Sequence, residues 1–122
     1  MGEKFIFLSS VATATSYFDA NIHSLLQNPA QLEILKELIQ EVTHLAHASN
    51  IHLGENQEER VLGILSSLPA NATSSLHRDF QKNKVKNELE SLCGFVVRQG
   101  NAKNLSINTF EHMYLALKNK LL

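Results

Sequence analysis

The residues best suited to chemistry lie in the stretch Thr73–Lys103. Ser74 and Ser75 stand where a helix is expected to begin, and Glu88 and Glu90 stand at the head of the next expected helix. Hydroxyl groups at a helix N-terminus bind exposed backbone N–H groups, and the same N–H groups attract anions. A carboxylate nearby can hold a hydroxyl group or an amine. The stretch therefore predicts part of a site for a small polar acid.

Each of these residues also has a purely structural interpretation. Serines at a helix start are most often ordinary N-cap residues, and acids in a first turn complement the helix dipole. Gly94 lies inside the second expected helix, where glycine costs about 1 kcal/mol relative to alanine. It therefore indicates the close approach of another helix or of a ligand, and packing is the interpretation that we favour.

The histidines and the single cysteine are the side chains that could bind a metal or react. His44 and His47 are three residues apart with His52 nearby, but no carboxylate completes a Glu-x-x-His pair. We interpret them as surface residues and predict no metal site. Cys93 lies in an apolar stripe with no histidine close in sequence, which indicates a buried, unreactive thiol.

Two basic features also have alternative interpretations. Lys4 precedes an apolar segment, where a lysine can act as a proton donor or can simply lay its stem on apolar atoms with its charge in water. The basic run Arg78–Lys86 fits a solvated loop, with the gripping of a nucleotide phosphate as the alternative.

Composition limits the possible partners and compartment. A chain of 122 residues is long enough for one domain with its own core. Its net charge of −1 gives no strong field to attract nucleic acid or anionic lipid. The single cysteine excludes an internal disulfide and suits a reducing cytosol. The apolar run Phe5–Leu8 is too short for a membrane span or a signal peptide. We therefore expect a cytoplasmic domain without nucleic-acid or membrane partners.

The spacing of apolar residues predicts an all-α bundle of about six helices. Only two prolines and five glycines interrupt the chain. The clearest helix has Asn28 as its N-cap and Pro29 as its first residue. The other expected helices are Ile22–Gln27, Glu55–Leu68, Glu88–Lys103 and a last one capped by Ser106. The segment Lys4–Phe18 fits either a strand or a buried helix, because its periodicity does not distinguish them.

Several short motifs, taken in order, resemble the C-terminal helical domain of the ketopantoate reductase (2-dehydropantoate 2-reductase) family over nearly the whole chain. They are Lys4-Phe5-Ile6-Phe7, Leu26-Gln27-Asn28-Pro29, Ala72-Thr73-Ser74-Ser75-Leu76-His77-Arg78-Asp79, and Glu88-Leu89-Glu90 followed by Gly94 and Val96-Val97-Arg98. The resemblance implies the helical fold also seen in the C-terminal domain of 6-phosphogluconate dehydrogenase.

The resemblance also implies roles for three residues. The family's general-acid lysine falls on Lys4, which would protonate the alkoxide as hydride arrives. The serine that binds the substrate carboxylate falls on Ser75. The glutamate that contacts the substrate hydroxyl and helps orient the lysine falls on Glu88. No residue is assigned to cofactor or metal binding.

The sequence departs from the family pattern on the segment that carries the lysine. Leu8 and Ala12 stand one and two turns after Lys4, where these reductases usually carry asparagines. Asn108-Thr109-Phe110 replaces a Pro-Val-Asn element near the last helix. The substrate contacts are therefore altered, and a 2-keto acid other than ketopantoate is at least as well supported.

In that family a Rossmann domain binds NADPH, and this sequence contains no G-x-G-x-x-G. We therefore expect residues 1–122 to form a single substrate-binding and dimerisation domain that lacks the N-terminal Rossmann domain. NADPH would bind the full-length enzyme and not this chain, which alone should be inactive. The expected partners are a small 2-keto acid, the Rossmann domain and a second copy of the chain. The alternative is a non-catalytic helical interaction or dimerisation module derived from the family.

Overall fold

The computed structural model describes residues 2–122, which form helices and no strands. In chain order these are α1 (Glu3–Phe18), α2 (Ile22–Gln27), α3 (Pro29–Ala48), α4 (Gln57–Ser66), α5 (Ser75–Gln81), the π-helical segment η1 (Glu90–Gly94), α6 (Phe95–Ala102) and α7 (Asn108–Asn119). The all-α prediction is confirmed. None of the helices within residues 2–122 combines the length and apolar character needed to cross a membrane.

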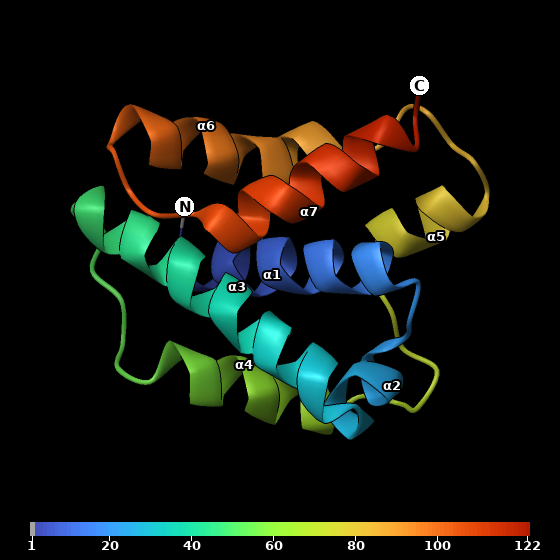
Figure 1. Ribbon diagram of the computed structural model, residues 1–122. Coiled ribbons are helices and arrows are strands. Elements are labelled where there is room, and N and C mark those ends of the chain that lie inside the picture. Colours follow the sequence, from blue (N-terminus) through green and yellow to red (C-terminus); the bar gives the residue numbers. More distant parts are fainter. Residues whose placement is uncertain (1) are drawn as a thin grey trace.

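The first helix, α1, lies in the middle of the bundle (Figure 1). It packs against α2, α3, α5, α7 and η1. Every residue from Ser9 to Ser16 is buried, so this part of the helix has no solvent-facing side. A helix surrounded on all sides does not alternate between polar and apolar faces. This is why the sequence alone did not distinguish a strand from a helix here, and the structure shows the buried helix.

The buried hydroxyl groups of α1 are satisfied largely within the helix itself. Ser10 Oγ donates to the Ile6 carbonyl at 2.7 Å, and Thr13 Oγ1 donates to the Ser9 carbonyl at 2.7 Å. A buried hydroxyl without a partner costs about 1–3 kcal/mol, and these bonds avoid that cost. Small polar side chains therefore serve as packing residues that let the neighbouring helices lie close to α1.

The longest helix, α3, has the N-terminus that the sequence predicts. Asn28 Oδ1 accepts a hydrogen bond from the Gln31 backbone N–H at 3.1 Å, and Pro29 is the first helical residue. The apolar stripe is buried as expected, at Leu35, Leu38, Ile39, Val42, Leu45 and Ala46. Since one face is apolar and the other charged, α3 packs across α1 with its outer face in water.

The last helix, α7, begins differently from the prediction. Ser106 is not its cap, because the helix begins at Asn108 and no side chain at the N-cap position, Ile107, binds it. Instead the Glu41 carboxylate of α3 accepts hydrogen bonds from the backbone N–H groups of Thr109 and Phe110, both at 2.9 Å. A carboxylate at a helix N-terminus is favoured by the helix dipole. The cap is therefore supplied across the bundle.

The helix expected at Glu88–Lys103 contains the π-helical turn η1 before it continues as α6. Gly94 ends this turn, and a Cβ atom there would lie 2.6 Å from Glu90 Oε1 and 2.7 Å from Arg98 Nη1. The ring of Tyr114 in α7 would also lie 3.2 Å from this Cβ atom, so an added methyl group would require small shifts of the three neighbouring side chains. π-Helical turns are uncommon and often lie near functional sites.

Two other helical glycines, one packed against Ile107 and one in open space, give a matched test of how closely α6 is packed. Alanine at Gly100 in α6 should lower the free energy of unfolding by about 1–2 kcal/mol, because its Cβ would lie 2.7 Å from Cγ1 of buried Ile107. Alanine at Gly63 in α4 should raise it by about 0.5–1 kcal/mol, because no atom lies within 4 Å and alanine favours helices. Denaturant unfolding measures both, and equal effects would contradict the close packing of α6 against Ile107.

Candidate functional site

Two of the three residues assigned by resemblance share one hollow. Ser75, the first residue of α5, and Glu88, which precedes η1, line a pocket of about 300 Å³. We call it the Ser75–Glu88 pocket. Both residues are exposed, and Leu8 and Ala12 of α1 contribute to its wall. Segments that are distant in the sequence are thus brought to one place by the packing of α5 and η1 on α1.

The third residue, Lys4, lies in an adjoining hollow. It is exposed in the first turn of α1 and lines a groove of about 390 Å³ between α1 and α4, which we call the Lys4 groove. Phe7 and Leu8 line both hollows. Residues four apart lie on the same side of a helix, so Lys4, Leu8 and Ala12 form one stripe along α1. The structure therefore places Lys4 beside the Ser75–Glu88 pocket and not within it.

Arg78 is a pocket residue that the sequence pattern did not single out. The sequence suggested a solvated loop from Arg78, but α5 extends to Gln81 and Arg78 lines the Ser75–Glu88 pocket. It is exposed, and within residues 2–122 its guanidinium takes part in no ion pair. The three-residue spacing from Ser75 is the signal that could have placed both side chains on one face.

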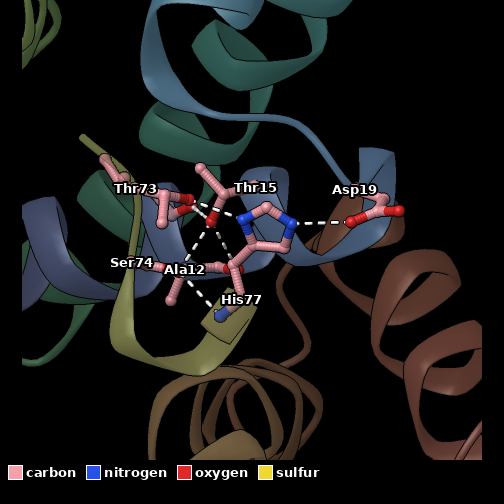
Figure 2. A network of polar contacts seen from close by, with 7 residues as sticks. Ala12, Thr15, Asp19, Thr73, Ser74 and His77 are labelled. Carbon is pink, nitrogen blue, oxygen red and sulfur yellow. Dashed lines mark hydrogen bonds and ion pairs between the residues drawn. The ribbon is translucent and has the colours of Figure 1, made fainter. Parts of the chain in front are cut away.

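The two adjacent serines have different environments. Ser74 is the N-cap of α5: its Oγ accepts a hydrogen bond from the His77 backbone N–H at 3.0 Å. It also forms a hydrogen bond of 2.7 Å with Thr15 Oγ1 of α1 (Figure 2). Ser75 has neither contact. Ser74 is therefore a structural residue, and the hydroxyl of Ser75 remains available at the pocket.

A buried histidine joins the start of α5 to the end of α1. The His77 ring is 3% exposed, with hydrogen bonds of 2.6 Å between Nδ1 and Thr73 Oγ1 and 2.7 Å between Nε2 and Asp19 Oδ1 (Figure 2). Asp19 itself ends α1 in the left-handed region with a φ of 49°. Because both ring nitrogens are bonded, the ring fixes the first turn of α5, and with it Ser75, against α1.

Glu90, the other acid of the stretch, is held away from the pocket. The Tyr114 hydroxyl lies 2.8 Å from both carboxylate oxygens and shares its single proton between them, and Arg98 Nη1 donates to Oε1 at 2.8 Å. Burial tends to raise the pKa of Glu90, but the hydrogen bonds from Tyr114 and Arg98 outweigh it and hold the pKa below its ordinary value. Burial and the bond to Glu90 raise the pKa of Tyr114. Glu90 thus anchors η1 to α7.

The cysteine lies in the core, whereas two histidines of α3 lie on the surface. Burial raises the pKa of Cys93 to about 12, and its Sγ lies 2.7 Å from Thr13 Oγ1, so the thiol is neutral and inaccessible. His44 and His47 are exposed on α3. Within residues 2–122, no three histidine, cysteine or acidic residues are grouped closely enough to hold a metal ion.

The family model for the C-terminal domain of ketopantoate reductases of the PanE/ApbA type matches residues 1–121. The chain belongs to this family. No curated protein matches the sequence significantly. The family resemblance inferred from the motifs is therefore confirmed, together with the helical fold that it implied.

Solved structures support the fold. A dimeric ketopantoate reductase from Staphylococcus aureus is similar with a TM-score of 0.89 and 18% identity, over 98% of this chain and 41% of that one. A PanE/ApbA family ketopantoate reductase from Ralstonia eutropha has a TM-score of 0.88 and 17% identity, over 98% of this chain and 39% of that one. A 2-dehydropantoate 2-reductase from Methylococcus capsulatus has a TM-score of 0.85 and 19% identity, over 96% of this chain and 40% of that one. The chain thus spans about two fifths of these proteins.

The different environments of the two serines can be tested by stability. Replacing Ser74 by alanine should lower the free energy of unfolding by about 1–2 kcal/mol, because the α5 cap and the bond to Thr15 are both lost. Ser75→Ala, the matched control, should change it by less than about 0.5 kcal/mol, because the side chain is exposed. Equal losses in denaturant unfolding would contradict the separate roles of the serines.

The Glu90 cluster predicts a pH-dependent effect. Because the folded pKa of Glu90 is lowered, its contribution is present above the ordinary value of 4.5 and is lost as pH falls through the folded pKa. Tyr114→Phe should raise that pKa and cost about 1 kcal/mol at neutral pH, a modest value because the carboxylate is more than half exposed. The loss should shrink in acid. Unfolding measured across pH, with an NMR titration of Glu90, checks both statements.

Tyr17→Phe is the control, since the Tyr17 hydroxyl contacts only exposed His112 at 3.3 Å and lies outside the cluster. It should leave the titration of Glu90 unchanged. A Tyr114 variant whose Glu90 titrates as in the unaltered protein would show that this hydrogen bond does not set the carboxylate's pKa.

Proposed function

We propose that this chain is the substrate-side domain of an NADPH-dependent 2-keto-acid reductase that resembles ketopantoate reductase, the enzyme of the pantothenate pathway. One observation carries the proposal: in a member of this family, Ser75 and Glu88 line one pocket and Lys4 lies in the adjoining groove on the same stripe of α1. The pocket is small enough for a keto acid of a few carbon atoms. Its wall on α1 excludes water from one side of such a ligand.

The roles follow from the chemistry of each side chain. The Ser75 hydroxyl would donate a hydrogen bond to the substrate carboxylate. The Lys4 ammonium would give a proton to the keto oxygen when hydride reaches the adjoining carbon, so that the product is a 2-hydroxy acid. Glu88, at the rim of the pocket, would accept a hydrogen bond from a substrate hydroxyl and orient Lys4 through its negative charge.

The dinucleotide requires a second domain. Residues 2–122 are helical and contain no strand–turn–helix unit that could cradle a pyrophosphate, so these residues do not form a Rossmann site. NADPH would supply the hydride from that second domain. This chain alone is expected to bind no dinucleotide and to show no turnover.

The proposal also includes two protein partners, a nucleotide-binding domain and a second copy of the chain, and a cytoplasmic location. Leu8 is 41% exposed and Ile64 is 49% exposed beside the Lys4 groove, which fits burial against the nucleotide-binding domain. A homodimer is proposed because the similar reductase from Staphylococcus aureus is described as dimeric. The near-neutral charge and the single buried thiol support a cytoplasmic protein without nucleic-acid or membrane partners.

The second candidate function is a non-catalytic interaction or dimerisation module derived from the same family. Leu8 and Ala12 favour it, because they present no hydrogen-bonding group on the stripe that carries Lys4. Lys4, Ser75 and Glu88 favour the reductase, because a module that only binds a protein has no need of these three groups around two hollows. Kinetics with the nucleotide-binding domain present separates the two functions.

Lys4→Ala in the protein that carries both domains should lower kcat by about 100-fold to 10,000-fold, the range for loss of a general acid, with a much smaller effect on KM. Lys103→Ala is the control, because Lys103 is exposed beyond the end of α6 and lines neither hollow. The measurement is NADPH oxidation with a panel of 2-keto acids.

Three outcomes of these kinetic measurements would each contradict a different part of the proposal: the role of Lys4, the reductase activity or the need for a second domain. An unchanged kcat for Lys4→Ala removes Lys4 from the mechanism. No turnover of any 2-keto acid by the two-domain protein favours the interaction module. Steady NADPH oxidation by residues 1–122 alone would show that the chain needs no second domain.

A further inference from the structure

The charges around the Ser75–Glu88 pocket raise a problem for an acidic ligand. Glu88 is one of the two charged residues that line the pocket, and its carboxylate repels a second carboxylate brought close to it. The three hydroxyl groups of the lining, from Thr73, Ser74 and Ser75, are neutral, and those of Thr73 and Ser74 already bond to His77 and Thr15. Lys4 lies in the adjoining groove, where the proposed reaction needs it at the keto oxygen. A cation inside the pocket is therefore required to hold the acid end of the ligand.

Arg78 is the other charged residue of the pocket lining. It follows Ser75 by three residues in α5, so the two side chains lie on neighbouring turns of one face. Within residues 2–122 the guanidinium has no carboxylate partner, whereas Arg60 pairs with Glu3 at 3.7 Å and Arg98 with Glu90 at 2.8 Å. The arginine at the pocket thus keeps its hydrogen-bonding groups for a ligand.

We propose that Arg78 binds the carboxylate of the 2-keto acid, together with Ser75. The inference rests on the proposed function and names the residue that anchors the substrate at this site. A guanidinium forms two parallel hydrogen bonds with a carboxylate, which fixes the direction of the ligand as well as its position. Its positive charge also offsets the repulsion from Glu88.

The anchor determines which acids fit. With the carboxylate at Arg78, the rest of the ligand lies toward the wall formed by Leu8 and Ala12 of α1, Ile22 of α2 and Leu92 of η1. This wall offers no side-chain hydrogen-bonding group. A second carboxylate would lie against these apolar side chains or near Glu88, and a charge in either place is disfavoured. The pocket therefore selects 2-keto monocarboxylates and rejects 2-keto dicarboxylates.

The position of α5 supports the same assignment. Hydrogen bonds from Ser74 to Thr15 and from His77 to Asp19, both of 2.7 Å, hold the first turn of α5 against α1. Arg78 follows His77 directly, so its backbone is fixed while its side chain is exposed. A long side chain on a fixed backbone, with its head group at the edge of a pocket, is suited to close on an anion.

The test is an NMR titration of the 15N-labelled chain with 3-methyl-2-oxobutanoate, its uncharged ethyl ester and 2-oxoglutarate. The acid should bind, with shifts at the Ser75 and Glu88 amides, and both the ester and the dicarboxylate should bind more weakly. Arg78→Gln should weaken binding of the acid by about tenfold or more and remove the preference for acid over ester. Arg78→Lys should restore part of the affinity, because it keeps the charge and loses the paired hydrogen bonds.

Lys82→Gln is the matched control. It removes the same charge one turn further along, at the C-cap of α5, and Lys82 does not line the pocket. Its affinity for the acid should stay within about twofold of the unaltered protein, since exposed charges at this distance are largely screened. Denaturant unfolding of both variants should be unchanged, which separates a binding role from a structural one.

The outcomes separate this inference from the function on which it rests. Binding that maps to Ser75 and Glu88 but is unaffected by Arg78→Gln, or is weakened equally by Lys82→Gln, overturns the role of Arg78 and leaves the substrate site standing. Tighter binding of 2-oxoglutarate than of the monocarboxylate overturns the selectivity. No shift at these amides with any 2-keto acid at millimolar concentration overturns both proposals.

Discussion

The complete burial of α1 from Ser9 to Ser16 is the constraint on which the rest of the structure depends. Small side chains let α2, α3, α5, α7 and η1 contact one central helix. Most of the hydroxyl groups among them bond to carbonyls of their own helix or to neighbouring helices, as Thr13 does to the Ser9 carbonyl and to Cys93, whereas the buried Ser16 Oγ has no partner within residues 2–122. The only exposed part of this helix is its N-terminal end, where Lys4 and Leu8 meet the two hollows.

The candidate site forms where other elements are tied to this helix. Ser74 and His77 join α5 to α1, so that Ser75 and Arg78 are presented on a segment of fixed orientation. On the other side of the pocket, Glu90 and Tyr114 hold η1 against α7, and Glu88 lies two residues before the start of this turn. Residues that bind no ligand thus determine the positions of those proposed to do so. The neighbours Ser74 and Ser75 accordingly differ in their contacts: Ser74 is bonded to Thr15 and to the start of α5, and Ser75 is not.

Membership of the reductase family is compatible with the apolar residues Leu8 and Ala12 that follow Lys4 on α1. The family domain brings a lysine, a serine and a glutamate to two adjoining hollows, while Leu8 and Ala12 make the shared wall apolar. Under the proposed function, such a wall would contact the hydrocarbon part of the substrate and α5 would bind its acid group. This chain spans about two fifths of the length of the solved reductases that it resembles.

The sequence by itself determined the helical class, the family, and the helices whose apolar face and caps are local, such as α3 with Asn28 and Pro29. It also placed Cys93 in the core and the α3 histidines in water. Tertiary structure alone decided the features that depend on distant residues. These are the helical state of α1, the capping of α7 by Glu41, the different contacts of Ser74 and Ser75, and the position of Arg78. The physical reason is that local spacing records which face of a helix is apolar, whereas caps, buried hydrogen bonds and pockets depend on residues that only folding brings together.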